Sequence, residues 1–300
     1  MSVSRHFVHG RHLDVTDTGV RRIGIHFLAH SASKVAVGTE AWAGMGPHRH
    51  ATWEIHWLRS GMMTWWSEAQ GVFDLEPGWC HVIPPGVQHG SCTGVLQPGE
   101  IWWLQVAPDG IGGLDAATRS GITQALAALP TIFHAGAMLE PWQQLLSAVE
   151  RLPPNAASPI DDLESIACLL RLLARVATGQ NLQAFSPRMQ RALTRAEEGQ
   201  ANVTALARAA KCSTPTLHRL FREEIGDSPA VWLKRRWIRE ACRRLRQEGE
   251  SITAIALDLG FRSGQHFATR FRAYTGFTPT QYRETARIPP AQAVDQSVRH

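Results

Sequence analysis

Three histidines and one glutamate have the residue types and the spacing of a metal site. His48, His50 and Glu54 are separated by two and four residues, so on a strand their side chains point to the same face. His89 follows the turn at Pro84–Gly86 and would come from a neighbouring strand. Three imidazoles and one carboxylate suit Zn, Fe, Mn, Ni or Cu, and these donors alone do not select one metal.

An organic effector is the other occupant that these side chains allow. The same imidazoles and carboxylate can form hydrogen bonds to a small molecule without any metal, and Trp57 is a nearby aromatic side chain that could line the pocket. The expected effector-binding residues are therefore His48, His50, Glu54, His89 and Trp57.

The last third of the chain has a composition that suits a polyanion. Residues 187–287 contain 19 Lys and Arg against 10 Asp and Glu, a net charge of +9, whereas the remaining residues carry a net charge of −4. Nucleic acid is the obvious polyanion for such a region. A basic surface that contacts only solvent is the alternative that charge alone leaves open.

The same region contains an internal repeat with a period of 50 residues, which indicates two copies of one supersecondary unit. Each copy has the pattern of a helix-turn-helix, with helices expected over Val203–Ala210 and Thr214–Glu224 in the first copy and over Ile252–Leu259 and Gly264–Tyr274 in the second. A serine precedes the second helix of each copy and is expected to cap it. The matching pairs are Ser213 with Ser263, Leu217 with Phe267, Phe221 with Phe271, Arg222 with Arg272, Gly226 with Gly276, Pro229 with Pro279, and Trp232 with Tyr282.

The exposed faces of these second helices predict contacts to duplex DNA. A helix fits the major groove, where short polar side chains reach base edges while arginines and helix N-termini hold phosphates. The basic helix expected over Pro229–Gln247 is about 28 Å long, which would place the two units about one DNA turn apart, ~34 Å. The residues expected to contact DNA are Ser213, Thr216, His218, Arg219, Arg222, Arg235, Arg239, Ser263, Gln265, His266, Thr269 and Arg270.

Residues 203–283 resemble the AraC/XylS family of bacterial transcription regulators. The resemblance includes LARAAKCSTPTLHRLF in the first copy and GFTPTQYR in the second. It implies that each copy docks a recognition helix in one of two successive major grooves. The base-reading positions that it implies are Pro215, His218 and Arg219 in the first copy and Gln265, His266 and Thr269 in the second. Pro215 and Thr269 depart from common usage in the family, since the proline cannot hydrogen-bond to a base and many relatives carry Arg in place of the threonine.

The N-terminal histidines belong to patterns that resemble the two cupin motifs. The first pattern is Gly44-x3-His48-x-His50-x3-Glu54-x6-Gly61, and the second is Gly78-x5-Pro84-x-Gly86-x2-His89. AraC-type regulators often carry a cupin-like sensor domain, so the resemblance implies that these residues bind an effector. Thr93 departs from the second motif, which usually has Asn there.

The sequence predicts an α+β multidomain fold, with an N-terminal cupin-like barrel or sandwich, a helical dimerisation segment and a C-terminal all-α tandem helix-turn-helix domain. The helices expected over Pro141–Leu152 and Pro159–Ala177 are amphipathic, so they pack either on the β domain or on a second copy of the chain. The expected boundaries are 1–115 for the effector-sensing domain, 116–178 for the dimerisation segment, 179–187 for a linker, 188–287 for the DNA-binding domain and 288–300 for a flexible tail.

Together these features predict a sequence-specific DNA-binding transcription regulator, rather than an enzyme, that responds to a small molecule or a metal. Expected partners are double-stranded DNA, the effector, a second copy of the chain and, for an activator, RNA polymerase. The five scattered cysteines and the lack of a secretion signal or a long apolar run predict a cytoplasmic protein without membrane contact. The alternative is a metal-dependent cupin enzyme, such as a dioxygenase or isomerase, with an appended DNA-binding domain.

Overall fold

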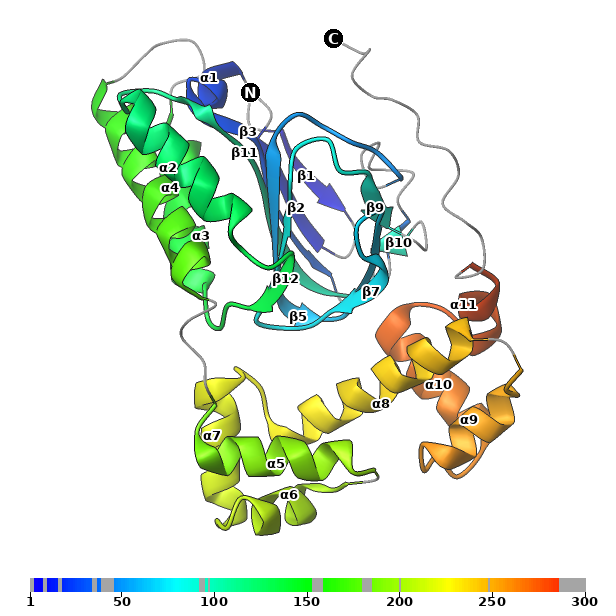
Figure 1. Ribbon diagram of the computed structural model, residues 1–300. Helices are drawn as coiled ribbons and strands as arrows, with labels where there is room; N and C mark the ends of the chain where they lie inside the picture. Colours follow the sequence, from blue (N-terminus) through cyan, green and yellow to red (C-terminus); the bar gives the residue numbers. More distant parts are fainter. Residues whose placement is uncertain are drawn as a thin grey trace.

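The chain folds into a sheet-rich N-terminal region, called the sheet region below, followed by a helical C-terminal region (Figure 1). The computed structural model describes residues 3–7, 10–15, 18–33, 37–38, 46–91, 95–96, 98–152, 159–179, 185–199, 201–247 and 249–285. The predicted linker at 179–187 is described only at its two ends, and the predicted tail at 288–300 lies outside the described residues.

The described strands form one large and two small antiparallel sheets. The large sheet has seven strands in the order β1-β2-β3-β11-β5-β8-β12, a three-stranded sheet has the order β7-β6-β9, and β10 pairs with β4. The strands are β1 (Val3–Phe7), β2 (Gly10–Val15), β3 (Ile23–Ser33), β4 (Val37–Gly38), β5 (Trp53–Gly61), β6 (Met63–Ser67), β7 (Gly71–Leu75), β8 (Trp79–Ile83), β9 (His89–Ser91), β10 (Val95–Leu96), β11 (Gly99–Ile111) and β12 (Ile132–His134).

Alternation along β5 separates a polar face from an apolar face. Glu54 and His56 lie on one face, where Glu54 is opposite Gln105 of β11 and His56 is opposite His81 of β8. Ile55 and its neighbours on the other face belong to the main apolar core. The period of two residues per repeat therefore places the predicted carboxylate ligand inside the sheet region.

Three helices cover the apolar face of the large sheet (Figure 1). They are α2 (Ala116–Ala127), α3 (Leu139–Glu150) and α4 (Pro159–Gly179), and a short helix α1 (Thr18–Arg21) precedes β3. Trp142 of α3 and Leu169 of α4 are fully buried in the same core as Ile55 of the sheet. Burying each such side chain stabilises the fold by about 1.5–3 kcal/mol relative to leaving it in water.

Helix α4 uses only part of its apolar surface for this packing. Ile166, Leu169 and Leu172 are buried against the sheet region, whereas Ile160 is 80% exposed and Leu163 is 67% exposed. Of the two alternatives that the amphipathic pattern left open, packing on the β domain is therefore observed, and a second apolar strip remains on the outside.

The helical region repeats one arrangement twice. Its helices are α5 (Pro187–Glu197), α6 (Val203–Ala209), α7 (Thr214–Glu224), α8 (Pro229–Arg246), α9 (Ile252–Asp258), α10 (Gly264–Thr275) and α11 (Pro279–Thr285). Helices α7 and α10 begin 50 residues apart, as do α8 and α11. Each copy has its own core, one around Leu217 and Phe221 and the other around Phe267 and Phe271.

The turn between the first two helices has the same backbone conformation in both copies. Lys211 has a φ of 51° and Gly260 has a φ of 83°, so both are left-handed. Ser213 and Ser263 then accept hydrogen bonds from the backbone N–H three residues on, which confirms the predicted N-caps. A left-handed residue ends one helix and a serine starts the next, so the helix pair bends sharply at a fixed point.

Candidate metal centre and nucleic-acid interface

The predicted ligands His48, His50, Glu54 and His89 lie together inside the sheet region. One possible ligand atom from each of the four residues lies within 4.8 Å of the other three. Strand β5 supplies the glutamate and β9 supplies His89, while His48 pairs with His89 through two backbone hydrogen bonds of 2.9 and 3.0 Å. Three of the side chains are buried, and His50 is partly exposed.

The imidazole rings of these histidines are held in one orientation. The Nδ1 atoms of His48, His50 and His89 lie 2.7, 2.9 and 2.8 Å from backbone carbonyl oxygens, to which they donate. The Nε2 atom of a neutral ring is then left as the acceptor, and metal-ligating histidines usually have this arrangement. At His50 and His89 the Nε2 atom lies within hydrogen-bond distance of Glu54 Oε2, where a proton on the ring would bond to the carboxylate and where a metal ion would replace that proton.

Glu54 is the most densely bonded side chain of the cluster. Its Oε1 accepts a 2.6 Å hydrogen bond from His56, and its Oε2 accepts a 3.2 Å bond from the amide of Gln105. Neither of these two residues was expected from the sequence. His56 could have been found because it stands two residues after Glu54 on the same strand face, whereas Gln105 is adjacent only through the pairing of β11 with β5.

The electrostatics of the cluster favour a bound cation. Burial would raise the pKa of Glu54, but the charge of His56 and the bonds from neighbouring histidines hold it well below its usual range. Burial and the neighbouring His89 lower the pKa of His48 to about 4, so this ring is neutral at neutral pH. Burial opposes a charge on His89, and Glu54 outweighs it and raises the pKa of that ring. An ionised carboxylate beside oriented imidazoles matches the donor set of a divalent transition metal.

Trp57 does not join this cluster, which corrects the expectation that it lines the pocket. Its side chain points to the opposite face of β5, into the core shared with the helices, and its indole donates a 3.1 Å bond to the carbonyl of Gly136. Trp65 of β6 instead lies edge-on to His56, with the ring centres 5.2 Å apart. The alternation of β5 explains the difference, because Trp57 is an odd number of residues from Glu54.

The second helices of the two copies present exposed polar faces. On α7, Pro215, Arg219 and Arg222 are exposed, while Thr216 and His218 are partly exposed. On α10, four side chains are exposed, namely Gln265, His266, Thr269 and Arg270. Within the part of the chain that the structure describes, the guanidinium groups on these faces form no ion pair. All six base-reading positions implied by the family resemblance therefore lie on accessible helix surface.

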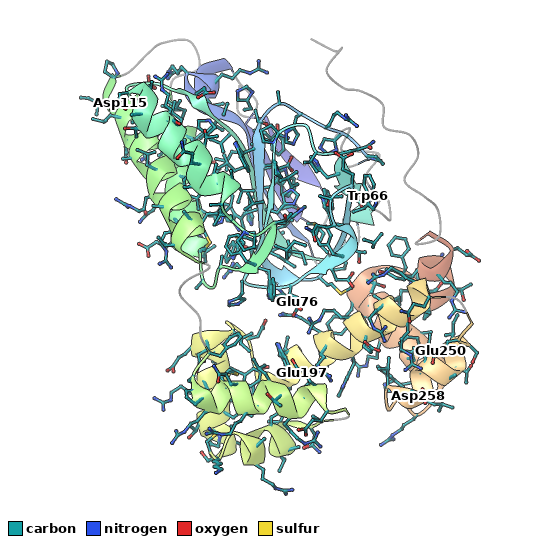
Figure 2. The ribbon with its side chains drawn as sticks, in the orientation of Figure 1. Trp66, Glu76, Asp115, Glu197, Glu250 and Asp258 are labelled. Atoms are coloured by element: carbon teal, nitrogen blue, oxygen red, sulfur yellow. The ribbon has the colours of Figure 1, made fainter. Side chains whose placement is uncertain are left out.

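Two predicted phosphate contacts on α8 are engaged within the protein instead. Arg235 is buried and paired with Asp227, which precedes α8. Arg239 is paired with Glu76, which follows β7 in the sheet region and lies at the end of that region facing α8 (Figure 2). Sequence patterns could not reveal either partner, because the charges on α8 are compatible with both solvent and protein contacts.

Comparison with known proteins identifies the helical region. Residues 206–285 match the family model described as a helix-turn-helix domain. An uncharacterized HTH-type transcriptional regulator of Haemophilus influenzae is 28% identical over 156 residues, and the HTH-type transcriptional activator RhaS of Escherichia coli is 29% identical over 156 residues. These alignments cover 49% of this chain and 52% and 55% of the relatives, so the chain spans about half the length of the curated relatives it matches.

Solved structures that are similar to about a third of this chain include DNA-binding domains of regulators. An AraC-type regulator from Chromobacterium violaceum is 27% identical, with 34% of this chain and 95% of that chain covered and a TM-score of 0.33. The DNA-binding domain of AdpA, solved in complex with a target DNA, is 31% identical, with 34% and 93% covered and a TM-score of 0.32.

The expected absence of a membrane span can be compared with the helices themselves. Among the described residues, no helix combines the length and the apolar character that crossing a membrane requires.

The family match agrees with the resemblance carried by the two sequence copies. Residues 206–285 of this chain therefore form a helix-turn-helix domain similar to that of HTH-type transcription regulators.

Proposed function

We propose that the protein is a sequence-specific DNA-binding transcription regulator whose N-terminal, cupin-like domain binds an effector. The observation that carries this proposal is the pair of exposed faces on α7 and α10, each preceded by a capping serine and each at the same position of a 50-residue repeat. Two such faces joined by one continuous helix suit two successive major grooves. Double-stranded DNA is thus the proposed partner of the helical region.

The experiment that tests DNA recognition is selection of duplexes by the full chain from a random library, followed by affinity measurements on the selected site. Arg219→Ala should weaken binding to that site by about 1–3 kcal/mol and relax base choice in one half. Arg243→Ala is the matched control, because this arginine is held by Glu240 of its own helix. Equal losses for Arg219→Ala on selected and mixed-sequence duplexes would show a phosphate contact, and failure to select any sequence would reject the proposal.

We infer further that the effector is a divalent transition metal ion, or is bound through one. His48, His50, Glu54 and His89 would hold the ion, and the orientation of their rings by backbone carbonyls supports this assignment. A bound ion would supply a fixed positive charge that joins β5, β9 and the segment before β5. An organic effector that binds the same side chains without a metal is the competing interpretation, which metal analysis separates.

The exposed strip of α4 supports a homodimer. Ile160, Leu163, Ala167, Leu170 and Ala174 follow each other at alternating spacings of three and four residues, which is the pattern of a two-helix seam. The first two are the most exposed large apolar side chains among the described residues. A second copy of the same helix is the proposed occupant, since it would offer an identical apolar strip.

Catalysis by the metal cluster is the second candidate function, favoured by the complete set of four ligands. Turnover of candidate substrates by metal-loaded protein, lost in His48→Ala, would support it. The match of residues 206–285 to helix-turn-helix domains favours the regulator, because a catalytic barrel alone has no use for a DNA-docking region.

A further inference from the structure

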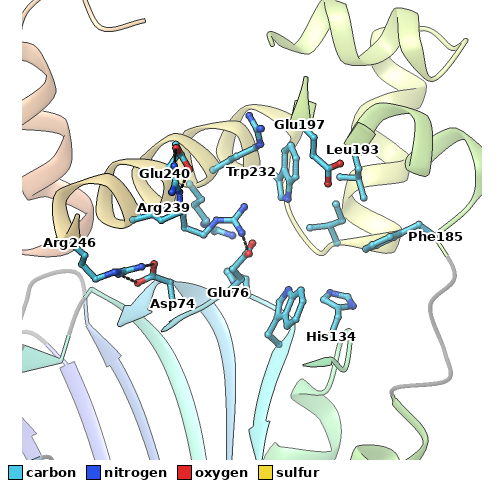
Figure 3. A pocket seen from close by; sticks show the side chains of 16 residues that line it. Asp74, Glu76, His134, Phe185, Leu193, Glu197, Trp232, Arg239, Glu240 and Arg246 are labelled. Carbon is cyan, nitrogen blue, oxygen red and sulfur yellow. Dashed lines mark hydrogen bonds and ion pairs between the residues drawn. The ribbon is translucent and has the colours of Figure 1, made fainter. Parts of the chain in front are cut away.

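Two carboxylates at one end of the sheet region face the arginines of α8 (Figure 3). Asp74 of β7 binds Arg246 through both of its oxygens, with distances of 3.3 and 3.1 Å to the two guanidinium nitrogens. The side chain of Asp74 is 9% exposed and that of Arg246 is 17% exposed. A two-point ion pair that water barely reaches fixes the orientation of both groups and is stronger than an exposed pair.

Tyr282 of α11 closes a ring of hydrogen bonds around this ion pair. Its hydroxyl accepts a 2.8 Å bond from Arg246 and lies 3.3 Å from the hydroxyl of Thr64 on β6. Thr64 in turn donates a 2.8 Å bond to Asp74. The four side chains come from four elements, two in each region, so the contact ties the second helical copy to the sheet region.

Glu76 forms the other ion pair of this contact, with Arg239, which lies about two helical turns before Arg246. Burial lowers the pKa of Arg239 to about 10, and this guanidinium is still charged at neutral pH. Its Nε atom is buried and has no hydrogen-bond partner among the described residues. Arg239 is thus partly shielded from water and incompletely bonded, which leaves it able to gain from a stronger acceptor.

An apolar contact between the sheet region and the second helical copy lies beside these ion pairs. Met62, which directly precedes β6, is almost fully buried in the core of the second helical copy, together with Ile238, Leu245 and Tyr282. A sheet-region side chain thus completes a helical core. We call the four residues Met62, Thr64, Asp74 and Glu76 the docking surface.

The first helical copy meets the sheet region differently, because Phe185, which packs against the core of that copy, contacts His134 of β12 with the ring centres 5.8 Å apart. A cleft of about 490 Å³, which Trp79 also lines, lies between this copy and the sheet region, with His134 on one side and Phe185 and Trp232 on the other (Figure 3). Trp232 occupies the position in the repeat that Tyr282 occupies in the second copy. Equivalent residues therefore face an open cleft in one copy and a bonded contact in the other.

We propose that the docking surface competes with DNA phosphates for Arg239 and Arg246. Residues 187–287 carry a net charge of +9, and Asp74 and Glu76 neutralise two of those positive charges in the docked arrangement. Both carboxylates present oxygens to a guanidinium as a phosphate does. The reading faces of α7 and α10 stay exposed in this arrangement, so the docking surface restrains DNA binding through charge and position, not by covering those faces. This inference rests on the proposed DNA-binding function.

The test compares the full chain with its Asp74→Asn/Glu76→Gln variant on a labelled mixed-sequence duplex, by fluorescence anisotropy over a series of salt concentrations. Arginines released from the carboxylates should tighten binding by about threefold or more, and the slope of log affinity against log salt should steepen by about 0.9 for each new phosphate contact. The control is Asp109→Asn/Glu140→Gln, which removes the same two charges at exposed positions away from the contact. Affinity and slope that match this control overturn the proposal.

Hydrogen exchange of the same proteins provides a readout that does not depend on DNA. Exchange over residues 279–285 should be faster in Asp74→Asn/Glu76→Gln than in the wild type and in the control variant, because Arg246, which donates a hydrogen bond to Tyr282 of α11, loses the ion pair that fixes it to the sheet region. Unchanged exchange overturns the docking surface even where DNA binding differs. A wild-type chain that binds no duplex rejects the proposed function instead, and the exchange result still decides whether the docking surface holds α11.

Discussion

Glu54 is the residue on which the candidate metal centre depends. Both of its oxygens are engaged, one by His56 and the other by the group of ligands. The sequence grouped His48, His50 and Glu54 by their spacing and added His89 from beyond the turn at Pro84–Gly86, and the four side chains lie close together, while their role as ligands stays a prediction. His56 and Gln105 were not predicted, although His56 stands two residues after Glu54 on the same strand face, whereas Gln105 is adjacent only through the pairing of β11 with β5.

Replacing a ligand and replacing its support should have different effects on metal binding. His89→Ala should abolish binding of Zn²⁺, because one of four donors is lost, whereas His56→Gln should weaken it by about 10- to 100-fold while keeping all four ligands. Elemental analysis of untagged protein and titration calorimetry with Zn²⁺ measure both effects. His218→Ala, on α7, is the control. Equal metal content in all variants and the wild type would contradict a site at these residues.

Glu100 of β11 makes a separate prediction about pH. Burial would raise its pKa, but hydrogen bonds from His30 and Arg59 outweigh burial and lower the pKa to about 2. A depressed carboxyl pKa stabilises the fold above the ordinary value of 4.5, and this stabilisation is lost as the pH falls toward 2.

The free energy of unfolding in urea, measured at several pH values, checks this expectation. The wild type should be more stable than Glu100→Gln at neutral pH, and the difference should shrink between about pH 4.5 and 2. A difference that stays constant over that range would show that the carboxyl charge is unimportant and that only its shape matters.

At the scale of elements, the helical copies were predictable and their surroundings were not. Periodicity and capping serines predicted α7 and α10 to within one residue, because a helix-turn-helix encodes its own turns locally. The amphipathic pattern of α4 predicted a helix but not its partner, because one pattern serves packing on a sheet or on another chain. Helix α4 has apolar residues for both surfaces.

The outer strip of α4 should control the oligomeric state. Leu163→Asp places a charge in the proposed seam and should convert dimers to monomers at micromolar concentration, without a large loss of stability, because Leu163 is already 67% exposed within one chain. Leu257→Asp, on α9, is the control because Leu257 is 54% exposed. Sedimentation velocity distinguishes monomers from dimers in both variants. An unchanged dimer in Leu163→Asp would place the interface elsewhere.

At the scale of the whole molecule, the contact between the two regions could not be read from the sequence. Arg246 and Asp74 are 172 residues apart and Thr64 and Tyr282 are 218 residues apart, so no local pattern links them. The sequence indicated a basic α8 and predicted Arg239 as a phosphate contact. In the structure Arg239 pairs with Glu76, because the folded chain brings the end of β7 next to α8.

Docking also predicts how a metal ion stabilises the molecule. A ligand at 100 times its Kd stabilises the region that binds it by about 2.7 kcal/mol. In the wild type, Zn²⁺ should raise the unfolding temperature of the helical region together with that of the sheet region. In Asp74→Asn/Glu76→Gln only the sheet region should respond. Scanning calorimetry with and without Zn²⁺ measures this, and identical responses in both proteins would show that the regions unfold independently.

Strand β6 separates the candidate metal centre from the docking surface by the thickness of a single backbone. Trp65 leans on His56 from one side of this strand, while its neighbour Thr64 bonds Asp74 and Tyr282 from the other. Trp65 and Thr64 are adjacent on one backbone, so a displacement of one side chain is passed directly to the other. A change at the Glu54–His56 pair that moves the indole of Trp65 is therefore expected to shift Thr64 as well, and a single residue step along β6 would connect an occupied metal centre to the contact with α11.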